Sequence, residues 1–290
     1  MRRLVPLLRA ASLCVPVLLG NCAPVDALNA TIDTAGLVIQ RDVSYAPGPR
    51  HAMDVYRPAD ISGPLPVVVF FYGGSWQTGS KRDYLFAAAE LARRGMIVAV
   101  PDYRLYPQVR FPGFLQDAAQ AVAYVQAHAA GWGGDSRRLV LVGHSAGAWL
   151  AVMLALDLAW LRAAGMDRGD IAGVAGLAGP YDFLPITGPD IQAVFSSAAD
   201  LAETQPVNFV DGRNPPMLLL HGDADDNVLA RNSHALAARI RAAGGPVVEK
   251  TYPGVGHIGI ISSFAPLLRG RSPSQDDVAA FISGLPGAGL

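Results

Sequence analysis

Residues 139–156 read L-V-L-V-G-H-S-A-G-A-W-L-A-V-M-L-A-L, and this stretch decides the expected fold. The apolar residues at 139–142 favour a buried strand, and a helical apolar pattern begins directly after Gly147. Ser145 lies in the turn between them, where a side chain at Gly143 or Gly147 would collide with the strand or the helix. The turn lifts the serine hydroxyl clear of the sheet edge at a helix N-terminus. The alternative is a glycine-bounded turn with an incidental serine.

Strands and helices alternate along the rest of the chain. Apolar runs predict strands at 38–45, 53–56, 67–71, 96–100, 171–177, 217–220 and 247–252. Helical patterns cover 81–94, 114–130, 231–243 and a final helix through 282 that opens with a capping-box pattern at 272–275. Alternation of this kind implies right-handed crossovers. We therefore expect an α/β fold, with a mostly parallel central sheet of about eight strands and helices on both faces.

The chain divides into a leader, a linker and one catalytic domain. Residues 1–22 form the leader, 23–50 a linker with the first edge strand, and 51–290 the catalytic domain. Within that domain, residues 179–216 hold no sustained strand and are rich in proline, so we predict a small lid-like insertion there.

Composition supports a large folded core and excludes some partners. Hydrophobic residues make up 51% of the chain and charged residues 16%, with a net charge of -1. This composition argues against disorder, and the lack of a basic cluster beyond residues 2–3 argues against nucleic acid binding. Both cysteines, Cys14 and Cys22, lie in the predicted leader, so the expected domain has no cysteine nucleophile and no cysteine metal site.

The first 22 residues are typical of an export signal. Arg2 and Arg3 precede an uncharged, mostly apolar run at 10–20 that is too short to span a bilayer as a helix. Residues 18–22, L-L-G-N-C, resemble a bacterial lipoprotein box, although Asn21 stands where a small residue is expected. We expect an exported protein, periplasmic or attached to the membrane through a lipidated Cys22. The alternative is a hydrophobic helix retained on a cytoplasmic protein.

Several polar groups follow the ends of predicted strands, and in parallel sheets such groups gather at one edge. A serine nucleophile needs a base within reach, and a carboxylate holds a histidine base in the correct tautomer. His257 alone among the six histidines follows the last strand in a glycine-rich loop, so we predict it as the base. The acid is one of Asp223, Asp225 and Asp226, which share a loop. Tyr72-Gly73-Gly74-Ser75-Trp76 follows another buried strand and predicts converging N–H groups, or else only a tight strand-to-helix loop.

Five stretches in this order resemble the α/β-hydrolase superfamily, specifically carboxylesterases related to hormone-sensitive lipase and bacterial feruloyl esterases. They are F-Y-G-G-S-W at 71–76, D-Y-R-L at 102–105, G-H-S-A-G at 143–147, H-G-D-A-D-D-N-V at 221–228 and G-V-G-H at 254–257. The resemblance implies that the acid is Asp225, and that the N–H groups of Gly74, Ser75 and Ala146 form the oxyanion hole. The family usually has histidine at the position of Tyr72, where it is generally structural.

These residues predict a serine carboxylesterase that acts on a small-molecule ester without a metal or organic cofactor. A fairly open site is expected because the segment before residue 51 is short, which favours short-chain or aromatic acyl groups. An amidase, arylformamidase or peptidase could use the same three residues. A non-catalytic envelope protein on a hydrolase scaffold is the alternative from another class.

Overall fold

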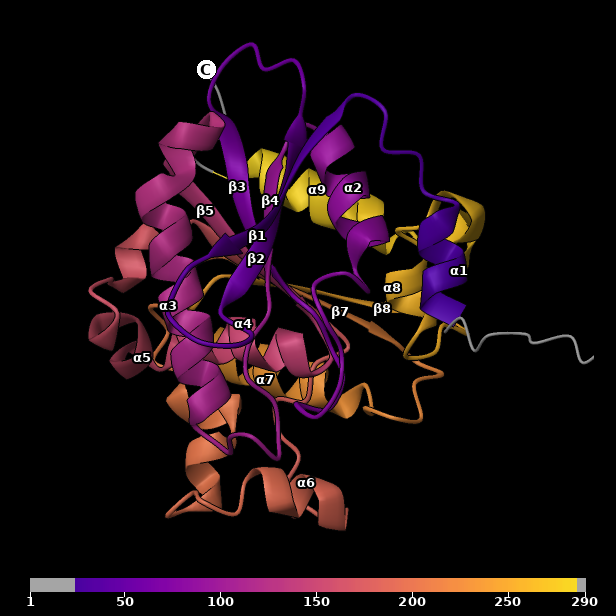
Figure 1. Cartoon of the computed structure of the whole chain (residues 1–290). Helices are drawn as coiled ribbons and strands as arrows, with labels where there is room; N and C mark the ends of the chain where they lie inside the picture. Colours follow the sequence, from indigo (N-terminus) through magenta and orange to yellow (C-terminus); the bar gives the residue numbers. More distant parts are fainter. Residues whose placement is uncertain (1–23, 286–290) are drawn as a thin grey trace, which may run out of the picture.

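The computed structural model describes residues 24–285, which form an α/β structure around one eight-stranded sheet (Figure 1). The strand order is β1-β2-β4-β3-β5-β6-β7-β8. The strands are β1 Leu37–Ser44, β2 Ala52–Pro58, β3 Leu65–Phe71, β4 Ile97–Pro101, β5 Gly134–His144, β6 Gly173–Leu177, β7 Met217–Gly222 and β8 Val247–Tyr252. β2 pairs antiparallel with both β1 and β4 at one edge, and strands β3 to β8 pair with one another in parallel. The predicted mostly parallel sheet is confirmed.

Helices cover both faces of the sheet (Figure 1). The α-helices in the described part are α1 Pro24–Ala30, α2 Leu85–Arg93, α3 Gly113–His128, α4 Ala146–Leu156, α5 Leu158–Ala163, α6 Pro189–Val194, α7 Arg231–Ala242, α8 Gly259–Ser262 and α9 Ser274–Gly284. Short 3-10 helices are η1 Ala129–Trp132, η2 Arg168–Asp170, η3 Leu201–Thr204, η4 Pro206–Phe209 and η5 Pro266–Arg271. Arg94, which follows α2, pairs with Asp276 of α9 at 2.7 Å, whereas α3 and α5 pack beside α4.

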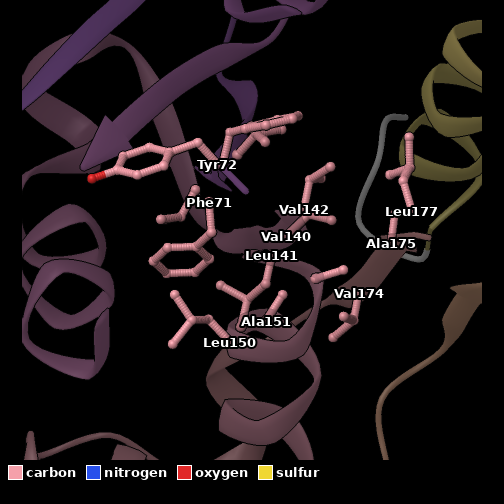
Figure 2. Close-up of a cluster of buried hydrophobic side chains, with 14 of the residues drawn as sticks. Phe71, Tyr72, Val140, Leu141, Val142, Leu150, Ala151, Val174, Ala175 and Leu177 are labelled. Atoms are coloured by element: carbon pink, nitrogen blue, oxygen red, sulfur yellow. The ribbon is translucent and has the colours of Figure 1, made fainter. Parts of the chain in front are cut away.

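The hydrophobic core centres on β3, β5, β6 and α4, whose side chains meet in Figure 2. In this view Leu141 of β5 points toward Leu150 and Ala151 of α4, whereas Val140 and Val142 point to the opposite face of the sheet. Every residue of α4 is buried, which explains why this helix is apolar on all sides rather than along one stripe. Such burial fixes the strand and helix that flank Ser145.

Two local helix predictions differ from the structure. The helix predicted at 81–94 begins at Leu85, because the backbone N–H groups of Ser80 and Lys81 donate to the carboxylates of Asp83 and Asp102 and hold the preceding residues in a turn. The capping box at 272–275 does not form. Pro273 caps α9 without a side-chain hydrogen bond, and the Ser272 hydroxyl contacts the hydroxyl of Ser274.

The segment predicted as a linker, 23–50, contains helix α1 in addition to β1. Asn29 holds α1 in place, since its side-chain amide donates to the carbonyl oxygens of Arg82 and Asp83 and accepts the N–H of Phe86. The local sequence did not predict α1 because these contacts come from residues more than 50 positions away. The predicted leader, 1–22, lies outside the described residues.

The region 179–216 contains α6, η3 and η4 and no strand. Helix α6 projects away from the sheet at the bottom of Figure 1. Its role as a lid remains a prediction.

Candidate active site

Ser145 occupies the sharp turn between β5 and α4, with φ 56° and ψ −123°. This left-handed conformation costs a non-glycine residue about 1–3 kcal/mol, and it persists only where the surroundings enforce it. A Cβ atom on Gly143 would lie 2.2 Å from the carbonyl oxygen of Gly147, and one on Gly147 would lie 2.1 Å from that of Phe71. Both glycines are therefore required by close backbone contacts, as their spacing around Ser145 predicts.

Three residues that are distant in the sequence meet at the carboxyl edge of the sheet. The Oγ of Ser145 lies 2.9 Å from Nε2 of His257, and Nδ1 of the same ring lies 2.8 Å from Oδ2 of Asp225. His257 follows β8 and Asp225 follows β7. All three side chains are buried. The structure thus brings together the predicted nucleophile, base and acid in one hydrogen-bonded row.

Asp225 accepts several hydrogen bonds that favour its ionised form. Its Oδ1 accepts the N–H groups of Asn227 at 3.0 Å and Val228 at 2.8 Å. Burial opposes ionisation, but hydrogen bonds from His221, His257 and the Val228 N–H outweigh it and hold the pKa of Asp225 well below its ordinary value. A carboxylate that stays ionised can fix the Nδ1–H tautomer of His257 and leave Nε2 free to accept the serine proton.

His221 supports the acid, a role that was not predicted from the sequence. The Nε2 of this buried ring lies 2.7 Å from the Val228 carbonyl oxygen and 3.3 Å from Oδ2 of Asp225, while Nδ1 lies 2.7 Å from the Ser233 hydroxyl. A carbonyl oxygen only accepts, so Nε2 carries the hydrogen and the Ser233 hydroxyl donates to Nδ1. The signal in the sequence was the histidine near the end of β7, four residues before Asp225.

The loop after β3 presents candidate oxyanion donors. Gly74, Ser75 and Trp76 have successive positive φ angles of 126°, 54° and 59°. Within residues 24–285, the N–H groups of Gly74, Ser75 and Ala146 have no acceptor, and Ala146 is the first residue of α4. Ser75 and Ala146 line the same pocket as Ser145, whereas Gly74 is not part of the lining. These three N–H groups remain the candidate oxyanion hole.

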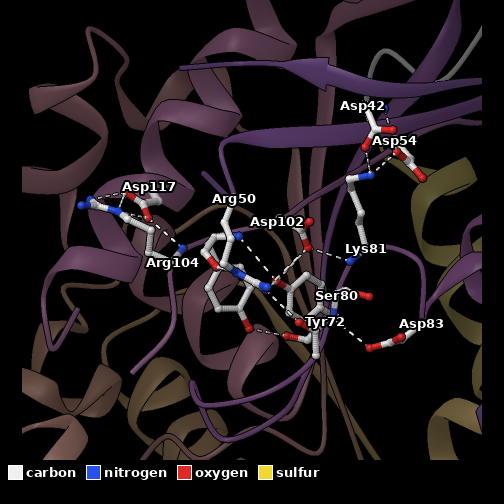
Figure 3. A network of polar contacts seen from close by, with 12 residues as sticks. Asp42, Arg50, Asp54, Tyr72, Ser80, Lys81, Asp83, Asp102, Arg104 and Asp117 are labelled. Atoms are coloured by element: carbon white, nitrogen blue, oxygen red, sulfur yellow. Dashed lines mark hydrogen bonds and ion pairs between the residues drawn. The ribbon is translucent and has the colours of Figure 1, made fainter. Parts of the chain in front are cut away.

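Tyr72 has a structural position at the base of this loop (Figure 3). Its hydroxyl accepts from Nη2 of Arg50 at 2.6 Å and donates to Oδ1 of Asp102 at 3.1 Å, and the same carboxylate oxygen accepts the N–H of Lys81 at 2.8 Å. The ring also stacks on Tyr103, with the ring centroids 4.6 Å apart. Tyr72 thus holds together the segments on both sides of the oxyanion loop.

Asp102 and Arg104, which belong to the motif D-Y-R-L at 102–105, bind different partners. Arg104 forms a bidentate ion pair with the buried Asp117 of α3, with Nη2 2.6 Å from Oδ1 and Nε 2.8 Å from Oδ2. Asp102 lies 3.7 Å from Arg50 Nη2. Arg104 therefore ties the loop after β4 to helix α3.

A pocket of about 290 Å³ opens at Ser145. One wall is apolar and includes Trp76, Phe183 and Ile186. Other lining residues, among them Asn227 and Arg231, come from the loop that carries Asp225 and from the start of α7. Groups of three or more histidine, cysteine or acidic side chains suited to a metal do not occur in the described part of the chain.

A serine on a strand-to-helix turn, with a base and an acid after two later parallel strands of an eight-stranded sheet, defines the α/β-hydrolase class. The BD-FAE family model matches residues 53–240, which is more than half of the chain. The chain therefore belongs to the BD-FAE family.

Comparison with individual proteins agrees with this placement. The chain is 29% identical over 274 residues to the isoprenylcysteine α-carbonyl methylesterase of Arabidopsis thaliana, covering 87% of this chain and 64% of that protein. It is 28% identical over 240 residues to esterase LipC of Mycobacterium tuberculosis, covering 76% and 60%. The chain thus spans less than two thirds of the length of these relatives. The phosphonate-inhibited esterase B of Lactobacillus rhamnosis shares the fold with a TM-score of 0.78 at 20% identity, covering 89% of this chain and 90% of that one. The resemblance to α/β-hydrolase carboxylesterases is confirmed.

Proposed function

We propose that this protein hydrolyses carboxylic esters through an acyl-enzyme formed on Ser145. The observation that carries the proposal is the row of hydrogen bonds from Ser145 to His257 at 2.9 Å and from His257 to Asp225 at 2.8 Å. The relatives named above are esterases by name, which supports the same reaction class.

Each proton transfer in the proposed reaction has a donor or an acceptor among these residues. Ser145 Oγ attacks the ester carbonyl while Nε2 of His257 takes its proton, and the ionised Asp225 stabilises the imidazolium. The N–H groups of Gly74, Ser75 and Ala146 receive the negative charge that develops on the carbonyl oxygen. His257 then protonates the departing alcohol, and water enters to repeat the sequence and release the acid.

The variant Ser145→Ala tests the nucleophile, with Ser196→Ala as a control because Ser196 is exposed and outside the site. Loss of the nucleophile in comparable enzymes costs about 10⁶ in turnover. We expect Ser145→Ala to lose hydrolysis of a p-nitrophenyl ester while it keeps the Tm of the parent, and Ser196→Ala to keep both. Parent-like turnover in Ser145→Ala would show that the nucleophile lies elsewhere.

We infer a preference for short-chain or aromatic acyl groups. The pocket at Ser145, about 290 Å³, is at or below the lower end of the range of about 300–1,000 Å³ common for small-molecule sites. Its apolar wall of Trp76, Phe183 and Ile186 suits a compact acyl group. A series of p-nitrophenyl esters from acetate to palmitate, with a benzoate, measures this preference as kcat/KM. A maximum at the longest chains would contradict it, and faster turnover of a matched amide would indicate an amidase.

We also propose that the protein is exported and attached to the membrane through a lipidated Cys22. The charged start at residues 2–3 and the sequence L-L-G-N-C at 18–22 support this proposal. Among the described residues, the structure has no helix with the length and apolar character needed to cross a bilayer. Metabolic labelling with an alkyne-palmitate should mark the parent and Cys14→Ser but not Cys22→Ser. Equal labelling of all three, or of none, would contradict lipidation at Cys22.

A further inference from the structure

His144, the residue before the nucleophile, is a buried histidine that the proposed reaction does not use. Neither of its ring nitrogens contacts the Ser145 hydroxyl. Nε2 lies 3.1 Å from the backbone carbonyl oxygen of His257, and Nδ1 lies 2.9 Å from the hydroxyl of Tyr84. The His144 ring also lies beside the ring of His257, with the centroids 4.9 Å apart. Its hydrogen bond therefore reaches the base through the backbone, and the reacting imidazole only packs beside its ring.

The contacts of His144 form a row of hydrogen bonds from the Tyr84 hydroxyl to the carbonyl of His257. The positions of the hydrogens in this row follow from the chemistry of the partners. A carbonyl oxygen only accepts, so Nε2 of His144 must carry the hydrogen. Burial lowers the pKa of His144 to about 3, so the ring is neutral at physiological pH and Nδ1 is an acceptor. Burial also raises the pKa of Tyr84, whose hydroxyl therefore stays protonated and donates to Nδ1.

The row continues from Tyr84 to the oxyanion loop. The N–H of Gly73 donates to the Tyr84 hydroxyl at 3.1 Å. Gly73 also packs against the nucleophile elbow, the turn between β5 and α4 that carries Ser145. A Cβ atom on Gly73 would lie 2.9 Å from Cβ of Ser145 and 3.2 Å from Nδ1 of His144. Every polar group in the row has a partner, and a fully satisfied buried network favours one arrangement of its parts.

We propose that His144 and Tyr84 are positioning residues that hold three segments in one catalytic geometry. These segments are the loop that carries His257, the nucleophile elbow that carries Ser145, and the oxyanion loop after β3. This inference rests on the proposed function of Ser145 and His257. The three segments follow β8, β5 and β3, so they are far apart in the sequence and local contacts cannot fix their relative positions. The row of hydrogen bonds from Gly73 through Tyr84 and His144 to the carbonyl of His257 fixes the relative positions of these loops. The Nε2–H of His144 fixes the backbone from which the base extends.

Two substitutions at one position test the donor. His144→Leu removes the Nε2–H, whereas His144→Gln places an amide N–H where it can reach the same carbonyl. A displacement of about 1 Å in the reacting groups can cost about 10²-fold in rate. We expect His144→Leu to lower kcat by about 10–100-fold with little change in KM, and His144→Gln to recover most of the loss. A role in packing alone would let both variants fall equally, and that result would overturn the proposal.

Tyr84→Phe tests the continuation to the oxyanion loop, because it removes the hydroxyl and keeps the ring. We expect a lower kcat in Tyr84→Phe, and a combined effect with His144→Leu that is smaller than the product of the single effects, since the two residues act in one row. Strictly multiplicative losses would show that Tyr84 and His144 act independently and would overturn the proposed row.

The rate of labelling by a fluorophosphonate probe separates this inference from the proposed function, since it measures activation of Ser145 without an ester substrate. A parent that labels rapidly but hydrolyses no ester contradicts the ester hydrolase and leaves the positioning role to be decided by the variants. Equal labelling of a folded His144→Leu and the parent overturns the positioning role alone. A parent that does neither overturns both.

The tautomer of His144 in the parent protein provides a measurement that needs no stable variant. Its ¹⁵N chemical shifts in histidine-labelled protein should show a neutral ring with the hydrogen on Nε2. A hydrogen on Nδ1, or a charged ring at neutral pH, would break the row at the carbonyl of His257 or at Tyr84 and refute the proposal.

Discussion

Gly147→Ala is the sharpest test of how the elbow holds the nucleophile. The added Cβ would lie 2.1 Å from the carbonyl oxygen of Phe71 and 2.5 Å from that of Tyr72, whereas ordinary contacts of this kind begin at 3.4 Å. Both atoms are backbone, so no side-chain rotation can relieve the collision. The start of α4 or the end of β3 must therefore move by more than 1 Å.

This displacement should affect both stability and rate. Overpacking of a close contact costs about 1–3 kcal/mol and sometimes more, and we expect about 3 kcal/mol here because only backbone can yield. At about 2–4 °C per kcal/mol, Tm should fall by about 6–12 °C. Since Phe71 and Tyr72 lead directly into the oxyanion loop, a movement of about 1 Å should also lower kcat by about 10²-fold.

Calorimetry and hydrolysis of p-nitrophenyl acetate measure the two effects. Gly169→Ala is the matched control, because a Cβ at Gly169 has no heavy atom within 4 Å and this residue lies on the surface far from Ser145 in the chain. The control should keep the Tm and kcat of the parent. If Gly147→Ala behaves like Gly169→Ala in both assays, the reasoning that the elbow depends on this backbone contact is refuted.

The remaining predictions concern two buried carboxylates, Asp225 and Asp117. Asp225→Asn should lower kcat by about 10⁴-fold through the wrong histidine tautomer, while Asp223→Asn should have little effect on kcat. Because folding lowers the pKa of Asp225, its ionised form stabilises the fold above its ordinary value of 3.8, and this contribution is lost as the pH falls below that value. The difference in Tm between the parent and Asp225→Asn should therefore shrink from about pH 6 to about pH 3, and a constant difference would contradict this. Arg104→Ala leaves the buried Asp117 without its bidentate partner and should destabilise the fold by about 2–3 kcal/mol in thermal unfolding. Arg137→Ala, which removes an arginine with an 87% exposed side chain, should leave Tm unchanged, and equal effects of the two arginine variants would count against the buried ion pair.

Strand and helix identities were largely predictable, because burial on both faces of a parallel sheet requires continuous apolar runs. The run at 67–71 lies in β3, and the run at 139–142 lies in the second half of β5. Boundaries were less predictable. The region 81–84 joined a turn instead of a helix because the carboxylates of Asp83 and Asp102 bind its backbone, and Asp102 is 21 residues away from Lys81.

The sequence by itself determined the strand–turn–helix around Ser145, since small residues at 143 and 147 are the only ones that the turn admits. It also identified His257, and the loop that contains Asp225, as groups that follow strands at one sheet edge. Only the tertiary structure decided which residues support them. His221 lies beside the carboxylate of Asp225, and His144, which is hydrogen-bonded to Tyr84, contacts the backbone carbonyl of His257. The physical reason is that a side chain's tautomer and partners depend on atoms brought close by folding, such as the carbonyl of residue 257 beside the ring of residue 144. Periodicity along a chain records which face is buried, and it carries no information about those distant partners.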